Sequence, residues 1–245
     1  MLAAYAENYR DLWNNHWWWQ VRRRFVLRLL DALAARRPLK SILDVGCGDG
    51  LFFEQLSRYG EIRGVEADAG LVDPSGPWAS RVTIAPFGSS YPDDRRYDLV
   101  LMLDSLEHIE DDRGAARRAH DLLEPGGFLL LTVPALQSLW SVHDAANRHF
   151  RRYDKAALRA VLESAGFEIE TLSFYFGWPV LPMYARKLLG GRRGESRAGD
   201  YAVLPPPRPL NGLLYAASAL EQALTGLKGT PIGSSLFAVA RRPRI

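Results

Sequence analysis

The sequence predicts an α/β fold in which a mostly parallel, seven-stranded sheet carries helices on both faces. Two observations support this. Strand-like apolar runs alternate with helical patterns along the chain, and the first run leads directly into a glycine-rich turn. The strand-like runs occur at 41–45, 61–66, 81–85, 97–102, 127–133, 167–174 and 234–242. Such alternation is typical of parallel strands joined by crossover helices.

The chain of 245 residues is long enough for one domain with insertions and a substantial core. Its hydrophobic content of 47% and charged content of 24% are ordinary for a globular protein. Cys47 is the only cysteine, so an intramolecular disulfide is excluded, which fits a reducing compartment. The N-terminal residues lack the apolar core of a secretory signal, and no run of about 18 apolar residues occurs. We therefore expect a cytoplasmic protein.

The first strand-like run continues into a turn with glycines at positions 46, 48 and 50. Glycine lets the backbone approach a ligand closely, because no Cβ stands in the way. The N–H groups at the start of the helix expected over 51–58 would face an anionic ligand. Glu66 ends the second strand about 20 residues after Gly46, a spacing at which an acid binds the hydroxyls of a ribose. The two features together indicate a cofactor that contains a nucleoside.

The order of residues in this turn decides between two kinds of cofactor. Dinucleotide-binding folds use G-x-G-x-x-G, whereas the third glycine comes one residue early in this chain. Asp49 lies inside the turn, where its charge would repel a pyrophosphate but could bind the ammonium group of an amino acid. A nicotinamide-dependent oxidoreductase is the alternative that these residues disfavour.

The turn D-V-G-C-G-D-G resembles motif I of the class I S-adenosylmethionine-dependent methyltransferases. Three further segments, 97–112, 122–134 and 164–170, resemble later motifs of the family in the same order. The resemblance covers roughly residues 40–175. It implies a Rossmann-like sheet whose last strand, 234–242, runs antiparallel to its neighbours, and it implies S-adenosylmethionine as the cofactor.

The resemblance also assigns residues to the cofactor site. They are Asp44, Gly46, Cys47, Gly48, Asp49, Glu66, Ala67, Phe87, Leu103 and Asp104. The turn would surround the methionine end of the cofactor, Glu66 would bind the ribose, and Asp104 would lie near the sulfonium. Family members often carry an acid after the third strand, but Phe87 is found there and is expected to stack on the adenine. A structural role for Asp44, as a cap of the turn, is an alternative that stays open.

Glu107 and His108 follow the fourth strand within the sequence D-S-L-E-H-I. The pattern D-x-L-E-H-I resembles that of methyltransferases acting on small molecules and quinone-like lipids. His108 is a candidate general base, because an unperturbed histidine titrates near neutral pH. The alternative, that both residues only fix the loop through backbone hydrogen bonds, stays open.

Polar side chains concentrate in segment 142–154 after the fifth strand. This loop leaves the carboxyl end of a parallel strand, where ligands bind in open α/β sheets. His149 is a second candidate base. Arg151 and Arg152, with Tyr153 beside them, are candidates to clamp a carboxylate or phosphate of the acceptor, and a surface role is favoured for at least one of the two arginines.

Metal binding is an alternative role for the same loop. His143, Asp144 and His149 carry possible ligand atoms. Their spacing matches no familiar metal site, and the chain offers no companion cluster. We therefore expect no metal.

Composition shifts along the chain predict three regions. Residues 1–37 would form an N-terminal helical cap, 38–174 with 234–245 the cofactor-binding core, and 175–233 an insertion over the acceptor site. The Gly-, Arg- and Pro-rich stretch 190–209 inside the insertion is expected to be mobile.

Trp17, Trp18 and Trp19 precede an apolar stripe of the expected N-terminal helix. Adjacent tryptophans on a helix point in different directions, so at least one should face the core or the pocket. Trp18 is predicted to contact the acceptor. Packing on the sheet, or closure as a lid, is the favoured interpretation. An interfacial membrane helix is the alternative, and peripheral membrane contact is possible but not favoured.

These features predict a methyltransferase that transfers a methyl group to a small-molecule or lipid-like acceptor. Oxygen is favoured over carbon or nitrogen as the methylated atom, because His108 and His149 are candidate bases. The net charge of +3 is mild, arginine clusters such as 22–24 are interpreted as solvated surface, and nucleic acid is not expected as a partner. The alternatives are an NAD(P)-dependent oxidoreductase and a non-catalytic cofactor-binding or membrane-associated module. The oligomeric state stays open.

Overall fold

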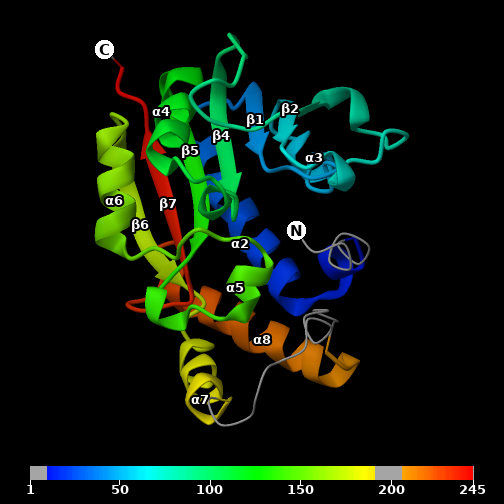
Figure 1. Cartoon of the computed structure of the whole chain (residues 1–245), viewed down its shortest axis with the longest axis vertical. Helices are drawn as coiled ribbons and strands as arrows, with labels where there is room; N and C mark the ends of the chain where they lie inside the picture. The colour runs from blue at the N-terminus through cyan, green and yellow to red at the C-terminus, as the bar shows by residue number, and fades with distance from the viewer. Residues whose placement is uncertain (1–9, 191–205, 245) are drawn as a thin grey trace.

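The computed structural model describes residues 10–190 and 206–244, which form a seven-stranded sheet with helices on both faces (Figure 1). The strands are β1 (Ser41–Val45), β2 (Glu61–Glu66), β3 (Val82–Ile84), β4 (Tyr97–Leu103), β5 (Leu123–Pro134), β6 (Glu168–Tyr175) and β7 (Ser235–Arg241). Their order across the sheet is β3-β2-β1-β4-β5-β7-β6. β7 pairs antiparallel with β5 and β6, while the other neighbours pair parallel. The predicted fold class is confirmed.

The central strands β1, β4, β5 and β7 are nearly continuous apolar runs, because both faces of the sheet are buried under helices. The helices are α2 (Trp17–Ala34), α3 (Phe53–Leu56), α4 (Asp112–Leu122), α5 (Val142–Ala146), α6 (Lys155–Ser164), α7 (Val180–Gly190) and α8 (Arg208–Thr225). α4 and α6 contact each other and cover one face. α2 and α3 cover the other face. α7 and α8 lie at the lower end of the molecule in Figure 1.

α6 begins and ends as the sequence predicts. Its N-cap is Asp154, whose carboxylate accepts a hydrogen bond of 2.7 Å from the backbone N–H of Ala157. Gly166 follows the end of the helix with a φ of 94°, which glycine adopts without strain.

α3 is shorter than the helix predicted over 51–58, since it spans only Phe53–Leu56. The chain leaves it through Gly60, where a Cβ would lie 2.0 Å from the backbone oxygen of Leu39. This close passage into β2 ends the helix early.

α2 packs along the sheet through the apolar stripe that the sequence predicts. The stripe consists of Val21, Phe25, Val26, Leu29, Leu30 and Leu33, all buried. The three tryptophans at its start are half-buried against the same cluster. Trp17 lies 5.7 Å from Trp178 between ring centroids, and Trp18 stacks on Phe176 at 6.0 Å. The predicted packing is confirmed, whereas lid closure and an acceptor contact for Trp18 stay predictions.

The insertion 175–233 contributes α7 and α8, and α8 packs on α2. Gln222 Nε2 donates to the backbone oxygen of Val21 at 3.1 Å, and the Arg28 side chain donates to the backbone oxygen of Gln222, also at 3.1 Å. Most of the stretch 190–209, predicted to be mobile, lies outside the described residues. The three-region division itself stays a prediction. Among the helices of the described ranges, none has the length and apolar character needed to cross a membrane.

Candidate active site

The carboxyl ends of β1, β2 and β4 meet at one edge of the sheet. Val45 of β1 lies beside Val65 of β2 and Met102 of β4 in the parallel register. Ligands of open α/β sheets bind outside this edge. The residues predicted to bind the cofactor lie at these strand ends or in the loops that follow β1 to β4, as their sequence positions require.

The turn after β1 requires glycine for two reasons. Gly46, Gly48 and Gly50 have φ values of 76°, 56° and 77°, in the left-handed region that strains other residues. A Cβ on Gly46 would also lie 2.7 Å from the Cβ of Ser105. The turn therefore passes directly against the loop after β4.

Cys47 directs its side chain toward β2. A Cβ on Gly64 of that strand would lie 2.3 Å from the Cys47 Sγ. Burial, with the nearby carboxylates of Asp44 and Glu66, raises the pKa of the thiol. The thiol is thus protonated at neutral pH, and the backbone of Cys47 is the part that can serve a ligand.

Glu66 is held rigidly at the end of β2. The residue is 8% exposed; its Oε2 accepts from the Gly48 N–H at 3.0 Å and its Oε1 from the Asp68 N–H at 2.9 Å. Each carboxylate oxygen has a second lone pair, so Glu66 retains capacity for a ribose hydroxyl. Ala67, which follows it, is exposed.

Asp44 is buried inside β1 near two charged groups. Burial raises the pKa of its carboxyl to about 7, an effect that Arg22 opposes and Glu66 increases. A cation bound beside Asp44 would favour its ionised form. Asp44 can therefore respond to a ligand as well as support the turn.

Two acids assigned to the cofactor site are paired with arginines from the N-terminal part of the chain. Arg10 Nη2 lies 2.6 Å from Asp49 Oδ2. Arg22 forms an ion pair with Asp104, whose φ is 52°. The guanidinium of Arg22 also lies 5.4 Å from the ring centroid of Trp18.

The interpretation of Arg22 as solvated surface is wrong, since the residue is only 4% exposed. It precedes Val26 by four residues and Leu29 by seven, so it lies on the buried stripe of α2. That spacing was the signal in the sequence. A single charge on an apolar stripe indicates a buried partner, which is Asp104 in this case.

The two apolar residues assigned to the cofactor are largely covered. Phe87 is buried and contacts Tyr91, with ring centroids 5.3 Å apart. Leu103 is half-buried against the cluster under α2. Stacking of Phe87 on an adenine stays a prediction.

The structure brings the two candidate bases together from different loops. The rings of His108 and His149 lie 4.6 Å apart in an edge-to-face arrangement. Desolvation and the neighbouring His149 lower the pKa of His108 to about 4, although the residue is partly exposed. The Phe150 N–H donates to the backbone oxygen of Glu107 at 2.8 Å, which joins the two loops.

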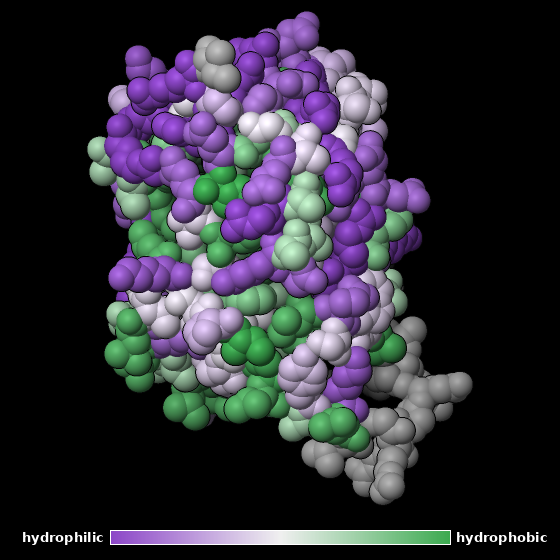
Figure 2. Space-filling view, turned by 90° about the vertical axis from the view of Figure 1, so that its left-hand side faces the viewer, coloured by the Kyte–Doolittle hydropathy of each residue, from purple (hydrophilic) through white to green (hydrophobic). Residues whose placement is uncertain are grey.

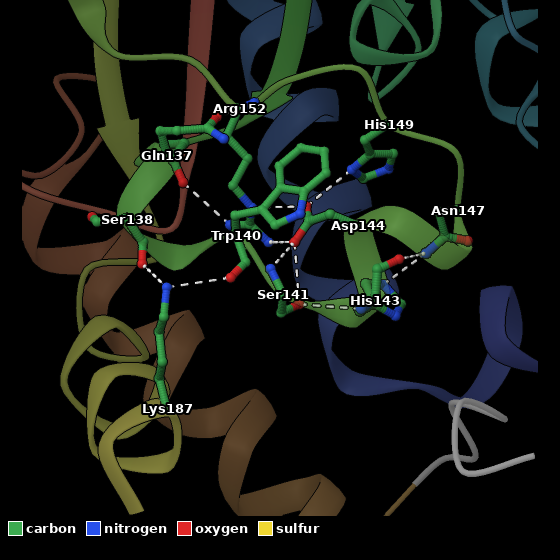
Figure 3. Close-up of polar contacts among 11 residues, drawn as sticks. Gln137, Ser138, Trp140, Ser141, His143, Asp144, Asn147, His149, Arg152 and Lys187 are labelled. Atoms are coloured by element: carbon green, nitrogen blue, oxygen red, sulfur yellow. Dashed lines mark hydrogen bonds and ion pairs between the residues drawn. The ribbon is translucent and has the colours of Figure 1, made fainter. Parts of the chain in front are cut away.

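Asp144 organises the loop after β5 (Figure 3). It is fully buried, and its Oδ1 lies 3.0 Å from His149 Nδ1 and 2.7 Å from Arg152 Nε. Its Oδ2 accepts from Arg152 Nη2 at 3.0 Å and from the Ser141 N–H at 2.9 Å. Although burial opposes ionisation, these contacts lower the pKa of Asp144. From the sequence, Asp144 was considered only as a metal ligand. The capping-box spacing from Ser141 to Asp144 was the signal in the sequence for its structural role.

The residues predicted to clamp the acceptor all have partners within the chain. Arg152 is held by Asp144, and Arg151 Nη1 lies 2.7 Å from Asp112 Oδ2. Tyr153 is 1% exposed and donates to the same Asp112 oxygen at 2.9 Å. These contacts anchor the loop to α4. Tyr153 belongs to the core in this conformation, so its predicted acceptor contact finds no exposed surface.

Glu107, His108 and His149 could hold a cation, since one ligand atom from each lies within 4.8 Å of the others. The sequence suggested His143, Asp144 and His149 as possible ligands, which is a different set. His143 instead forms a hydrogen bond with Asn147, whose side-chain nitrogen lies 3.0 Å from His143 Nε2. Glu107 is 1% exposed, and desolvation with the neighbouring Asp104 raises the pKa of its carboxyl well above the usual value.

The chain is similar to known methyltransferases. A family model described as a methyltransferase domain matches residues 17–172. The ubiquinone biosynthesis O-methyltransferase of Alkalilimnicola ehrlichii is 30% identical over 46% of this chain and 47% of that protein. The chain thus spans about half the length of the first curated relatives. The enzyme of the same name from Xanthomonas euvesicatoria is 30% identical over 76% of this chain and 82% of that protein.

A solved structure shows the same fold. It is a TehB-like SAM-dependent methyltransferase of Corynebacterium glutamicum, with a TM-score of 0.56 and 17% identity. The superposition covers 99% of this chain and 100% of that one. At this identity the likeness concerns the fold alone.

Proposed function

The chain belongs to the class I S-adenosylmethionine-dependent methyltransferases, and we propose that it methylates an oxygen atom of a small-molecule or lipid-like acceptor. One observation carries the choice of oxygen. Asp144 holds His149 at the edge of the sheet, beside His108 and the loop after β4. A histidine oriented by a buried carboxylate is suited to take a proton from a hydroxyl group.

The polar groups at this edge fit S-adenosylmethionine. Asp49 Oδ1 and Ser105 Oγ are buried and have no hydrogen-bond partner among the described residues. Buried polar atoms without partners have unused hydrogen-bonding capacity, which a polar ligand could satisfy. Asp49 suits the ammonium group of the methionine end, and Glu66 suits the ribose. When bound, the cofactor supplies a methyl group on a positively charged sulfur.

Asp104 would face the positive charge of the sulfonium. Its ion pair with Arg22 fixes the carboxylate in place and balances its charge. The loop after β4 therefore presents a positioned acid without an uncompensated negative charge. The Asp104 N–H donates to the backbone oxygen of Thr132 at 2.9 Å, which fixes the loop further.

His149 is the better of the two candidate bases. A base whose pKa is about 4, as for His108, binds a proton too weakly to be effective near neutral pH. Asp144 binds Nδ1 of His149, so the free Nε2 would take the proton from the acceptor hydroxyl. The carboxylate of Asp144 would then stabilise the imidazolium. His108 would position the ring of His149 through their contact.

The names of the curated relatives support the choice of oxygen, since they describe O-methyltransferases of ubiquinone biosynthesis. A hydroxylated, lipid-like acceptor agrees with those names. We also place the reaction in the cytoplasm, a proposal supported by the single, buried thiol of Cys47.

Calorimetric titration with S-adenosylmethionine, S-adenosylhomocysteine and NADH tests the cofactor. We expect binding of the first two alone, and at least a tenfold loss of affinity in Glu66→Ala, roughly 1.4 kcal/mol or more. Glu61→Ala is the matched control, because Glu61 is an exposed acid of the same strand. Binding of NADH alone would overturn the proposal.

Single-turnover methylation of hydroxylated aromatic compounds tests the base. His149→Gln should lower the rate by about 100-fold or more at neutral pH. An unchanged rate would remove His149 from the mechanism.

A further inference from the structure

α8 has the reverse of the ordinary amphipathic arrangement, because its protein-facing side is polar. Asn211 Oδ1 accepts from the Trp17 N–H at 2.9 Å, and Ser218 Oγ accepts from the Trp178 side chain at 2.9 Å. Gln222 is 3% exposed and bonds to the backbone of α2. Helices of globular proteins normally bury their apolar side.

The outward side of α8 consists of leucines. Positions 210, 213, 220 and 224 share one face of the helix, and positions 181 and 188 share one face of α7. The exposed fractions are 47% for Leu210, 66% for Leu213, 60% for Leu220, 79% for Leu224, 78% for Leu181 and 80% for Leu188. We call these six residues the leucine surface. Figure 2 shows hydrophobic residues gathered over the lower end of the molecule, where α7 and α8 lie.

Net positive charge concentrates in the same part of the chain. The described parts of the insertion, 175–190 and 206–233, contain four Lys or Arg and one Glu, a net charge of +3. Apolar side chains among basic residues are typical of segments that lie on anionic membranes. Two copies meeting through this surface would bring two such positive charges together, which disfavours a dimer.

The leucine surface is connected to the candidate active site. Lys187 of α7 donates to the backbone oxygen of Ser138 at 2.7 Å, in the loop that also carries His149 (Figure 3). Phe150 and Val142 of that loop are 50% and 58% exposed. An acceptor held in a membrane could reach the site from this side.

We propose that α7 and α8 dock the protein peripherally on a membrane that contains anionic phospholipids, with the leucine surface inserted at the level of the head groups. Large exposed apolar patches on soluble proteins mark such interaction sites. The inference rests on the proposed function, because it explains how a lipid-like acceptor would reach the site from the membrane. Binding to vesicles requires neither cofactor nor acceptor, so it can be tested separately.

Flotation of the full chain with vesicles tests the proposal. The wild type should float with mixed phosphatidylglycerol and phosphatidylcholine vesicles, less so with phosphatidylcholine alone, and high salt should release it. Combined Leu213→Gln, Leu220→Gln and Leu224→Gln substitutions should lower the partition coefficient by on the order of 100-fold. The control is Ile84→Gln, a change of an apolar residue that is 54% exposed on the edge strand β3, and it should float like the wild type.

Calorimetric titration of the triple variant with S-adenosylmethionine shows whether it is folded, and its affinity should equal that of the wild type. Failure of the wild type to float, or equal flotation of the triple variant, overturns the docking proposal and leaves the cofactor proposal standing. Light scattering gives the remaining outcome: a wild-type dimer that the triple substitution dissociates would assign the leucine surface to a second copy.

Discussion

The cofactor edge and the loop after β5 lie next to each other but are built differently. At the cofactor edge, backbone conformation decides the geometry: Gly46 has a φ of 76° and its missing Cβ admits Ser105. In the loop after β5, side chains meet on one buried carboxylate, that of Asp144. A short motif is therefore enough to predict the cofactor edge. The loop after β5 instead depends on a network of side-chain contacts that a single substitution can remove.

The largest effect is expected from Asp144→Ala. The substitution leaves the guanidinium of Arg152 buried without its partner and should lower the free energy of unfolding by about 3–5 kcal/mol. Urea denaturation measures this loss. Glu163→Ala is the control, because the exposed pair of Glu163 with Arg159 should contribute no more than about 0.5 kcal/mol.

The cofactor affinity of the Asp144→Ala variant shows whether the loop after β5 and the cofactor edge depend on each other. If the two regions are independent, folded Asp144→Ala should bind S-adenosylmethionine as the wild type does while its methylation rate falls. A parallel loss of cofactor binding would mean that the loop after β5 supports the cofactor edge as well.

A smaller effect is expected from Gly46→Ala at the cofactor edge. The added methyl group meets Ser105 at 2.7 Å in a left-handed conformation, which should destabilise the fold by about 1–3 kcal/mol. Affinity for S-adenosylmethionine, measured by calorimetry, should also decrease. Gly212 of α8 is the control, because a Cβ added there would meet no atom within 4 Å. Gly212→Ala should raise the free energy of unfolding by roughly 0.5–1 kcal/mol, since alanine favours a helix more than glycine does. Equal stability of the two variants would contradict the conclusion that Gly46 is required by its backbone conformation.

The smallest effect concerns pH. The folded-state pKa of His108, about 4, lies below the value of about 6.5 expected for the unfolded chain. Its contribution to stability is therefore complete above pH 6.5 and is lost as the pH falls toward 4. The His108→Gln variant should lose less free energy of unfolding than the wild type across this window in denaturant titrations. Identical pH profiles would show that His108 is not held neutral by the fold.

The sequence predicted those parts of the fold that are encoded locally. Alternating apolar runs located the strands, and Asp154 with Gly166 located α6. The antiparallel last strand came from the family resemblance rather than from the residues. The length of α3 could not be predicted, because it depends on how closely the chain passes Leu39 at Gly60.

The candidate site was predictable where one residue acts with its own neighbours in sequence, as in the turn at 46–50. The role of Asp144 could not be predicted, because Arg152 and His149 contact its carboxylate only when the loop is folded. The pair of Arg22 with Asp104 joins α2 to the loop after β4, far apart in the sequence. The polar inner side of α8 could not be predicted either, because its side chains bond to backbone groups of α2, such as the oxygen of Val21, that lie far away in the sequence.

The position of β7 between β5 and β6 sets the order in which the molecule can assemble. β6 pairs only with β7 in the described sheet, and residues 176–234 separate the two strands along the chain. Closing so long a loop is slow, because its entropy is lost before the strand contacts form. During synthesis the parallel strands can therefore form first, while β5 is left as an open edge of the sheet and β6 stays unpaired until β7 emerges. A translational pause before residue 235 would prolong that exposed state and favour aggregation.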